Sequence, residues 1–299
     1  MLCLVAVLTS LVITSMAMAK RHGDRQSDYQ GGLRACELAE MGVALAVHPL
    51  IKPGDPLLRR KVSAMESFEV AVSTEESRLN LNSLLTEERL PVLVRIFNSW
   101  GLLPADAQGI ATTLLDWTDA DDLKSRPDSA ERADYQRMSF TDRPFNRKFT
   151  SMDELDLVAR ASEIQAVKPD WRTFFTLRGN GQVDVNTATA EVLSMVAGVP
   201  LENATQLINK RIGPDGLPYT QDDLPLQSLE EALVLLGLAG PQAESIRPLL
   251  TLQGTLLRVE SVGKAGDEQH GIVVVAAPPG ATPRITEWRE YRLTEGPQL

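Results

Sequence analysis

The pattern of apolar and polar positions begins with one long helical signal. Residues 1–19, MLCLVAVLTSLVITSMAMA, are uncharged, and a helix of that length is about 28 Å long, close to the roughly 30 Å apolar core of a bilayer. A helical pattern with amphipathic spacing continues beyond this run until KPGDP, residues 52–56, ends it. We therefore expect a single N-terminal helix, apolar first and amphipathic later, with residues 1–22 as its transmembrane part.

A cleaved signal peptide is the competing interpretation of this run, because Ala17-Met18-Ala19 resembles a cleavage site. The run has no positive n-region and the helical pattern continues past it, so a membrane anchor is favoured. Lys20, Arg21 and Arg25 follow the run. Taken alone, these charges predict a cytoplasmic main domain by the positive-inside rule.

Strand and helix signals then come in blocks. Residues 67–74 alternate apolar and polar positions, which is typical of a half-buried strand. Helical signals dominate residues 80–249, apart from the polar, aperiodic stretch 123–148. Helices are expected at 86–101, 104–117, 151–161, 187–198, 201–211 and 226–237, and strands at 251–263, 271–279 and 284–294. Strands on both sides of a helical block predict an α+β fold with a helical domain inserted into one sheet.

Composition restricts the function. The 299 residues are 43% hydrophobic and 23% charged, a globular balance, and carry a net charge of −10, which repels nucleic acid and anionic membranes. Cys3 and Cys36 are the only cysteines, so we expect neither a disulfide framework nor a cysteine zinc site. His22, His48 and His270 lie far apart in sequence. A histidine metal site is therefore not expected unless folding brings these residues together.

Residues 183–211 resemble a helix-hairpin-helix unit, with Gly198-Val199-Pro200 as the turn. In DNA-binding members, the hairpin amides and the following helix N-terminus hold a phosphate. Residues 184–240, however, contain eight acidic residues against only Lys210 and Arg211, and Pro200 has no amide hydrogen. A structural hairpin is favoured, and no nucleic-acid-binding residue is assigned.

Two acidic stretches are candidate calcium sites, because Ca²⁺ takes carboxylate and carbonyl oxygens from flexible loops. In LLDWTDADD, residues 114–122, Asp116 and Trp117 end a helix. GPDGLPYTQDD, residues 213–223, resembles calcium loops of several secreted and pilin-like proteins. The candidate ligands are Asp119, Asp121 and Asp122 in the first stretch and Asp215, Asp222 and Asp223 in the second. The alternative for both stretches is a plain turn with solvated carboxylates.

Neither stretch shows the features of a catalytic site. Acid/base catalysis needs carboxylates in contrasting environments, and adjacent acids in a polar loop do not indicate such a separation. The sequence shows no nucleophile with a base partner, no Gly-rich phosphate loop and no HExxH motif. We therefore expect a protein that is not an enzyme, with no catalytic residue.

The order of four motifs resembles that of the minor pseudopilin K family of type II secretion systems (general secretion pathway protein K). The motifs are SFEVAVSTEESRLNLNSLL, LLDWTDADD with a polar loop and Tyr135, FTSMDELDLV, and GQVDVNTATAEVLSMVAG, which together span about residues 66–200. The resemblance implies a type IV pilin-like fold, a long N-terminal helix on a small antiparallel sheet with a large inserted all-α domain. The expected parts are residues 1–22 in the membrane, 23–79 as periplasmic helix and first strand, 80–249 as the insert, and 250–299 as the last strands.

The resemblance also implies a function. Members of this family are expected at the tip of a periplasmic pseudopilus with the I- and J-type minor pseudopilins, where they support protein export across the outer membrane. The acidic helical domain of some members binds calcium. The lack of a carboxylate before Asp24 agrees with this family. The protein is thus expected to be a single-pass inner-membrane protein with its main domain in the periplasm.

One feature departs from the family. The family has a basic leader that is cut after a glycine, whereas this sequence starts inside the apolar run. We expect either a misassigned start codon or a divergent, unprocessed member, and a missing leader would also explain the unusual charge topology. The alternatives are a membrane-anchored helix-hairpin-helix DNA-binding protein of competence type and a minor pilin of a type IV pilus.

Overall fold

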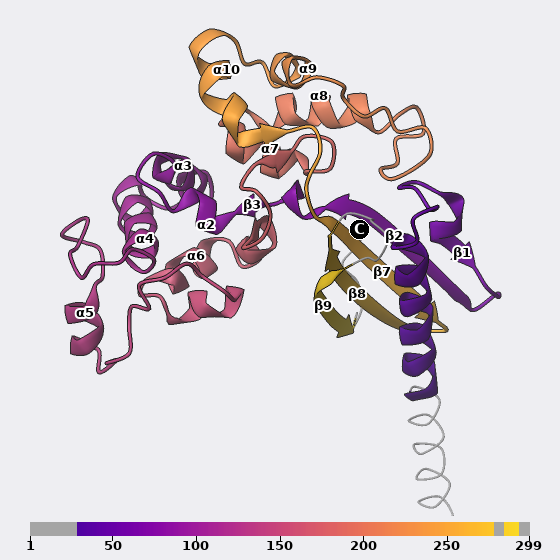
Figure 1. The fold of residues 1–299 in the computed structure, drawn as a ribbon, viewed down its shortest axis with the longest axis horizontal. Coiled ribbons are helices and arrows are strands. Elements are labelled where there is room, and N and C mark those ends of the chain that lie inside the picture. Colours follow the sequence, from indigo (N-terminus) through magenta and orange to yellow (C-terminus); the bar gives the residue numbers. More distant parts are fainter. Residues whose placement is uncertain (1–28, 278–283, 293–299) are drawn as a thin grey trace, which may run out of the picture. The chain divides into compact units, whose positions relative to one another are not determined.

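The computed structural model describes residues 29–277 and 284–292 (Figure 1). The described residues form two compact units, one made of the chain up to Val72 and from Arg258 onward, the other of Ser73–Leu257. The predicted transmembrane part, residues 1–22, lies outside the described residues. Within the described part of the chain, no helix combines the length and apolar character needed to cross a membrane.

The first unit contains a five-stranded sheet in the order β1-β2-β7-β8-β9. Its strands are β1 (Arg59–Lys61), β2 (Glu66–Thr74), β7 (Leu257–Ala265), β8 (Glu268–Ala276) and β9 (Ile285–Arg292), and the short 3₁₀ helix η1 (Pro56–Leu58) precedes β1. The pairs β1–β2 and β8–β9 are antiparallel. The four predicted strands correspond to β2, β7, β8 and β9, although the run expected from residue 251 enters this sheet only at Leu257. The exposed β1 has no apolar alternation and was not predicted.

The helix that spans residues 29–46 packs against this sheet (Figure 1). The Ser261 hydroxyl of β7 donates to the carbonyl oxygen of Ala39 over 2.8 Å. A Cβ atom on Gly263 would lie 2.0 Å from the carbonyl oxygen of Ala35, and one on Gly42 would lie 2.7 Å from Cγ2 of Val70. The two glycines therefore allow an approach of helix and sheet that a larger residue would prevent.

The second unit is mainly helical. Its helices are α2 (Leu81–Leu84), α3 (Leu90–Ser99), α4 (Pro104–Asp116), α5 (Arg132–Arg137), α6 (Ala161–Val167), α7 (Ala190–Ala197), α8 (Leu201–Arg211), α9 (Leu229–Leu235) and α10 (Gly240–Ile246), with 3₁₀ helices η2 (Glu75–Ser77), η3 (Met152–Leu157), η4 (Trp171–Phe174) and η5 (Arg247–Leu249). Two short parallel pairs join β3 (Leu79–Asn80) to β4 (Phe175–Thr176) and β5 (Val183–Asp184) to β6 (Leu250–Thr251). The mixed helix and sheet content expected from the sequence is confirmed.

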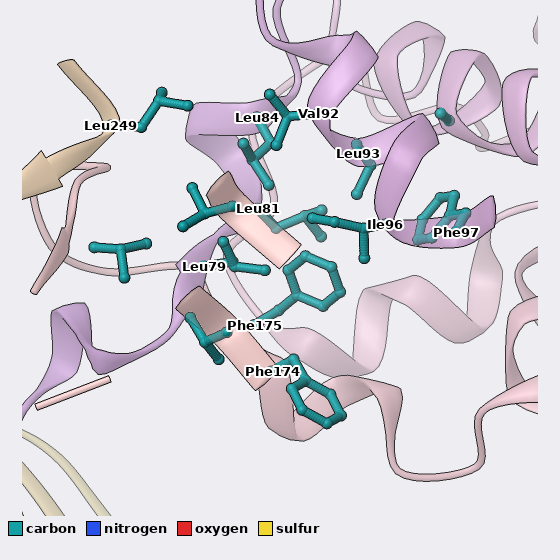
Figure 2. Close-up of a cluster of buried hydrophobic side chains, with 14 of the residues drawn as sticks. Leu79, Leu81, Leu84, Val92, Leu93, Ile96, Phe97, Phe174, Phe175 and Leu249 are labelled. Carbon is teal, nitrogen blue, oxygen red and sulfur yellow. The ribbon is translucent and has the colours of Figure 1, made fainter. Parts of the chain in front are cut away.

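One apolar core extends through the second unit. Figure 2 shows part of it, where side chains from α2, α3, β3 and β4 meet. The residues labelled there are Leu79, Leu81, Leu84, Val92, Leu93, Ile96, Phe97, Phe174, Phe175 and Leu249. Buried side chains of this kind are the main favourable contribution to folding.

Three helical predictions in this unit differ from the structure. The helix expected from Thr86 begins at Leu90, because Pro91 lacks the amide hydrogen that would bond one turn back. In place of the α-helix expected over residues 151–161, the chain forms the 3₁₀ helix η3, and α6 begins only at Ala161, after Arg160 with a left-handed backbone of φ 69°. The stretch 123–148 was expected to be irregular, yet it contains α5.

Candidate metal centre

The C-terminal end of α4 is held by a buried aromatic cluster. Trp117 follows the last residue of α4 and is fully buried. Its ring lies edge-on to Tyr135, with centroids 5.6 Å apart, and stacks on Phe149 with centroids 6.1 Å apart. Phe145 packs on the same indole at 5.0 Å. The conjunction of LLDW with Tyr135, noted in the sequence, therefore reflects one contact that holds the intervening loop against α4.

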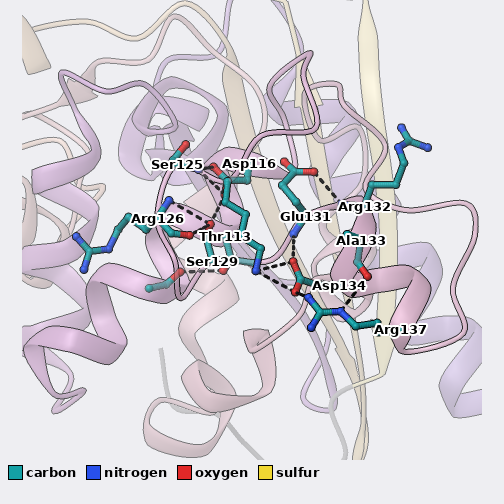
Figure 3. Close-up of polar contacts among 12 residues, drawn as sticks. Thr113, Asp116, Ser125, Arg126, Ser129, Glu131, Arg132, Ala133, Asp134 and Arg137 are labelled. Carbon is teal, nitrogen blue, oxygen red and sulfur yellow. Dashed lines mark hydrogen bonds and ion pairs between the residues drawn. The ribbon is translucent and has the colours of Figure 1, made fainter.

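Asp116 connects the same helix end to the loop. Its carboxylate is fully buried and accepts from the Ser125 amide over 3.2 Å and from the Ser129 hydroxyl (Figure 3). Glu131, the N-cap residue of α5, lies beside Asp116 in Figure 3. The loop after α4 thus folds back over the helix end and brings Glu131 toward Asp116.

Three carboxylates converge at this point. Asp116, Asp119 and Glu131 each offer an oxygen, and these oxygens all lie within 4.8 Å of one another. Oδ1 of Asp119 and Oε1 of Glu131 are buried without a hydrogen-bond partner. Oε2 of Glu131 accepts from the Arg132 amide over 2.9 Å. The cluster therefore holds two buried acceptor atoms that a cation could satisfy.

The carboxylates of this cluster repel one another, because they carry like charges. Burial, followed by repulsion from Asp116, raises the pKa of Asp119 to about 6. Burial also raises the pKa of Glu131 to about 7, with Asp119 and Asp116 adding to the effect. A bound cation would reverse both effects, because it stabilises the ionised form of each ligand.

The donor set fits a hard cation. Ca²⁺ binds oxygens at about 2.3–2.6 Å, so oxygens on opposite sides of the ion lie about 4.6–5.2 Å apart. The three oxygens fall within that span. Because all three candidate ligand groups are carboxylates, they suit calcium better than metals that prefer nitrogen or sulfur.

The structure places the three predicted ligands of LLDWTDADD in different surroundings. Asp119 belongs to the cluster. Asp121 accepts from the Leu123 amide over 2.8 Å, and Asp122 accepts from Nε of Arg132 over 2.8 Å. Asp121 and Asp122 are therefore not part of the convergent group.

Two members of the cluster were not among the predicted ligands. Asp116 was interpreted only as a helix end. Glu131 lies in an aperiodic stretch and has no sequence signal that separates it from its neighbours. Its participation results from the fold of the loop between α4 and α5.

The second acidic loop uses its carboxylates to form turns. Asp222 accepts from the Asp215 amide over 3.0 Å and from the Thr220 hydroxyl over 2.6 Å. Asp215 accepts from the Leu217 amide over 2.8 Å, and Asp223 from the Tyr219 amide over 2.8 Å. Among the described residues, the convergent groups of potential metal ligands do not include Asp215, Asp222 or Asp223. Calcium binding by this loop stays a prediction.

The helix-hairpin-helix pattern corresponds to α7 and α8. Gly198 joins them with a left-handed backbone of φ 67°. The amides of Gly198 and Val199 both donate to the carbonyl oxygen of Ser194, over 2.8 and 3.2 Å. These hairpin amides are thus used within the chain rather than presented to a phosphate.

Comparison with known proteins identifies the domain that contains the carboxylate cluster. Residues 77–169 match the family model described as protein K of the type II secretion system (T2SS). We refer to this matched segment as the protein K domain. This match confirms the family resemblance inferred from the order of motifs. The protein K domain includes α4, α5 and all three carboxylates of the cluster.

The fold is also similar to that of a solved structure. The chain matches one chain of the GspK–GspI–GspJ complex from the type 2 secretion system of enterotoxigenic Escherichia coli with a TM-score of 0.59. The match covers 90% of this chain and 99% of that chain at 14% sequence identity, a level at which it establishes the fold alone. A search of curated proteins found no match.

Proposed function

We propose that this protein is a minor pseudopilin of a type II secretion system, a structural subunit that caps the pseudopilus tip and supports protein export across the outer membrane. The observation that carries this proposal is the protein K domain at residues 77–169. The likeness in fold to a chain of the GspK–GspI–GspJ complex supports it. Under this proposal the protein acts by assembly with other subunits rather than by catalysis.

The first unit supplies the pilin-like part in this proposal. It combines the helix at residues 29–46 with a sheet in which β2 and β7 are neighbours, although the second unit separates these strands in sequence. We interpret Ser73–Leu257 as the insertion into a pilin-like domain. Residues 1–22 would anchor the chain in the inner membrane, with both units in the periplasm.

The N-terminal helix is the proposed contact surface for other subunits. Tyr29, Leu33 and Met41 are 60%, 50% and 40% exposed, and their spacing places them along one side of the helix. Exposed apolar side chains on one stripe are typical of an interaction surface. We propose that this stripe packs on I- and J-type minor pseudopilins.

The carboxylate cluster is the proposed calcium site. Asp116, Asp119 and Glu131 would hold Ca²⁺ and so connect the end of α4 to the start of α5. The bound ion would neutralise three buried or partly buried carboxylates and rigidify the loop between them. The proposed role is structural.

Co-purification tests the assembly role. We expect the full-length chain to be captured by the I- and J-type pseudopilins of its own secretion system, and expect Leu33→Glu and Met41→Glu to reduce capture. Val234→Glu, a change at an apolar side chain of α9 that is 74% exposed, is the matched control and should leave capture intact. No capture by any candidate pseudopilin would contradict the proposal, and capture by type IV pilus minor pilins instead would favour the pilus alternative.

A further inference from the structure

We propose that Cys36, His270 and Glu290 form a zinc-binding site in the first unit. Cys36 lies on the helix at residues 29–46, His270 on β8 and Glu290 on β9. One potential ligand atom of each residue lies within 4.8 Å of those of the other two. The site is separate from the carboxylate cluster, which belongs to the second unit.

The register of β8 and β9 explains why two of the ligands meet. His270 is opposite Arg292, and Ile272 is opposite Glu290. Because alternate residues of a strand share a face, His270 and Glu290 project from the same side of the sheet as diagonal neighbours. Cys36 then completes the group from the helix.

The histidine has an unmet requirement for a partner. Nε2 of His270 is buried and has no hydrogen-bond partner, and the His270 side chain is only 12% exposed. The nearest carboxylate oxygen, Oε2 of Glu290, is 3.5 Å away. An imidazole nitrogen in this situation can be satisfied by a metal ion.

The neighbouring groups complete and orient the set. Oε1 of Glu290 accepts from the indole nitrogen of Trp288 over 2.8 Å, which orients the carboxylate. Oε1 of Glu40, one helical turn after Cys36, is 4.0 Å from the thiol sulfur. Glu40 is therefore placed to supply the fourth ligand, or a water molecule takes that position.

The ligand types select the metal. Thiolate sulfur, imidazole nitrogen and carboxylate oxygen are the donors of tetrahedral zinc sites, whereas Ca²⁺ and Mg²⁺ take oxygen. Zinc bonds of about 2.0–2.3 Å place neighbouring ligand atoms about 3.3–3.8 Å apart. The present separations, all within 4.8 Å, require only small side-chain adjustments to reach that geometry.

The local charge also favours a divalent cation. Three carboxylates, those of Glu290, Glu40 and Glu37, act electrostatically on the Cys36 thiol. These carboxylates create a negative field at the sulfur, and zinc would compensate it while binding the thiolate. The bound ion would then connect the N-terminal helix to β8 and β9.

Cobalt binding to the full-length, reduced chain in detergent tests the proposal. Co²⁺ serves as a probe because thiolate ligation produces a sulfur-to-cobalt charge-transfer absorption, which a site made of oxygen ligands does not. We expect one equivalent of Co²⁺ to produce this absorption, Zn²⁺ to displace it, and Zn²⁺ to raise the melting temperature. Cys36→Ser and His270→Gln should abolish the absorption, and Glu290→Gln should weaken Zn²⁺ binding about tenfold or more.

Matched variants make the result specific. Cys3→Ser and His48→Gln change the other cysteine and an exposed histidine, and both should retain the absorption and the zinc-dependent rise in melting temperature. Absence of the absorption in the wild type, or its retention in His270→Gln, would overturn the proposal. If circular dichroism shows that Cys36→Ser or His270→Gln does not fold, the test rests on Glu290→Gln, because the Glu290 side chain is 46% exposed. Unchanged Zn²⁺ affinity in Glu290→Gln would also overturn the proposal.

Discussion

Arg211 donates from Nη2 to the carbonyl oxygen of Ala188 over 2.6 Å, and from Nη1 to the carbonyl oxygen of Val185. Arg211 is the last residue of α8, and the two acceptors precede α7. The side chain is buried, and burial lowers the pKa of its guanidinium. Of the two basic residues in 184–240, Arg211 thus connects the two helices of the hairpin, and its side chain is not available to bind a phosphate.

Replacement of Arg211 should destabilise the second unit. We expect Arg211→Met to lower the free energy of unfolding by about 2–4 kcal/mol, because two buried carbonyl groups lose charged hydrogen bonds. Chemical denaturation measures the change. Lys210→Met, at the exposed neighbouring position, should stay within about 0.5 kcal/mol of the wild type. Equal effects of the two variants would contradict the structural role of Arg211.

Trp117 should tolerate phenylalanine better than alanine. Its indole packs on three aromatic rings, yet its Nε1 has no hydrogen-bond partner. We expect Trp117→Ala to cost about 3–5 kcal/mol of stability and Trp117→Phe clearly less, since an aromatic ring retains much of the packing and no hydrogen bond is lost. Leu123→Ala, at a side chain that is exposed in the same loop, is the control for thermal denaturation. Equal losses for the two Trp117 variants would show that the nitrogen matters more than the ring.

Calcium should stabilise the protein more at higher pH. Asp119 and Glu131 have pKa values of about 6 and about 7 in the folded protein, above the roughly 3.9 and 4.3 of free side chains. The folded state therefore binds more protons than the unfolded state between about pH 4 and about pH 7, so metal-free stability falls as pH rises through this window. Calcium binds the ionised carboxylates, and the gain in melting temperature should increase from about pH 5 to about pH 8.

Two variants assign the calcium effect to particular side chains. Glu131→Gln should remove most of the calcium-dependent gain, because Glu131 belongs to the convergent cluster. Asp121→Asn should keep the gain, since Asp121 accepts from the Leu123 amide outside the cluster. The reverse outcome would move the site from Glu131 to Asp121, and loss of the gain in Asp215→Ala/Asp222→Ala alone would move it to the second acidic loop.

Gly263 should be intolerant of any side chain. A Cβ atom there would lie 2.0 Å from a backbone oxygen of Ala35, so the helix would have to move away from β7. We expect Gly263→Ala to lower the free energy of unfolding by about 1–3 kcal/mol. A Cβ atom on Gly32, in the helix at residues 29–46, would meet only Oε2 of Glu268, at 3.9 Å. Gly32→Ala should therefore be neutral or stabilising by about 0.5–1 kcal/mol. A stability of Gly263→Ala equal to that of the wild type would contradict the close approach.

The sequence was most informative where structure follows from local periodicity. Alternation along 67–74 predicted one strand, because side chains of a strand face opposite sides in turn. The three C-terminal runs bounded by Gly and Pro predicted the others, and all four correspond to strands of one sheet. The prediction failed where a short-range pattern was overridden by single residues. Because of Pro91, α3 begins later in the chain than predicted, and the left-handed backbone at Arg160 separates η3 from α6.

The candidate sites were only partly predictable. Of the candidate ligands in residues 114–122, only Asp119 belongs to the convergent carboxylates Asp116, Asp119 and Glu131, whereas Asp121 and Asp122 do not. The difference arises because the loop after α4 folds back and is held by Trp117 and Ser129. The spacing of residues along the chain does not show that this loop folds back onto α4.

By itself, the sequence determined the approximate positions of β2, β7, β8 and β9 and of several helices, the acidic character, and the order of motifs typical of protein K, since each depends on neighbours along the chain. Only the tertiary structure decided that Arg211 closes the hairpin, that Glu131 joins Asp116, and that Cys36 meets His270 and Glu290. Those contacts depend on strand register and on the packing of a helix against a sheet, which place residues distant in sequence within a few ångströms of one another.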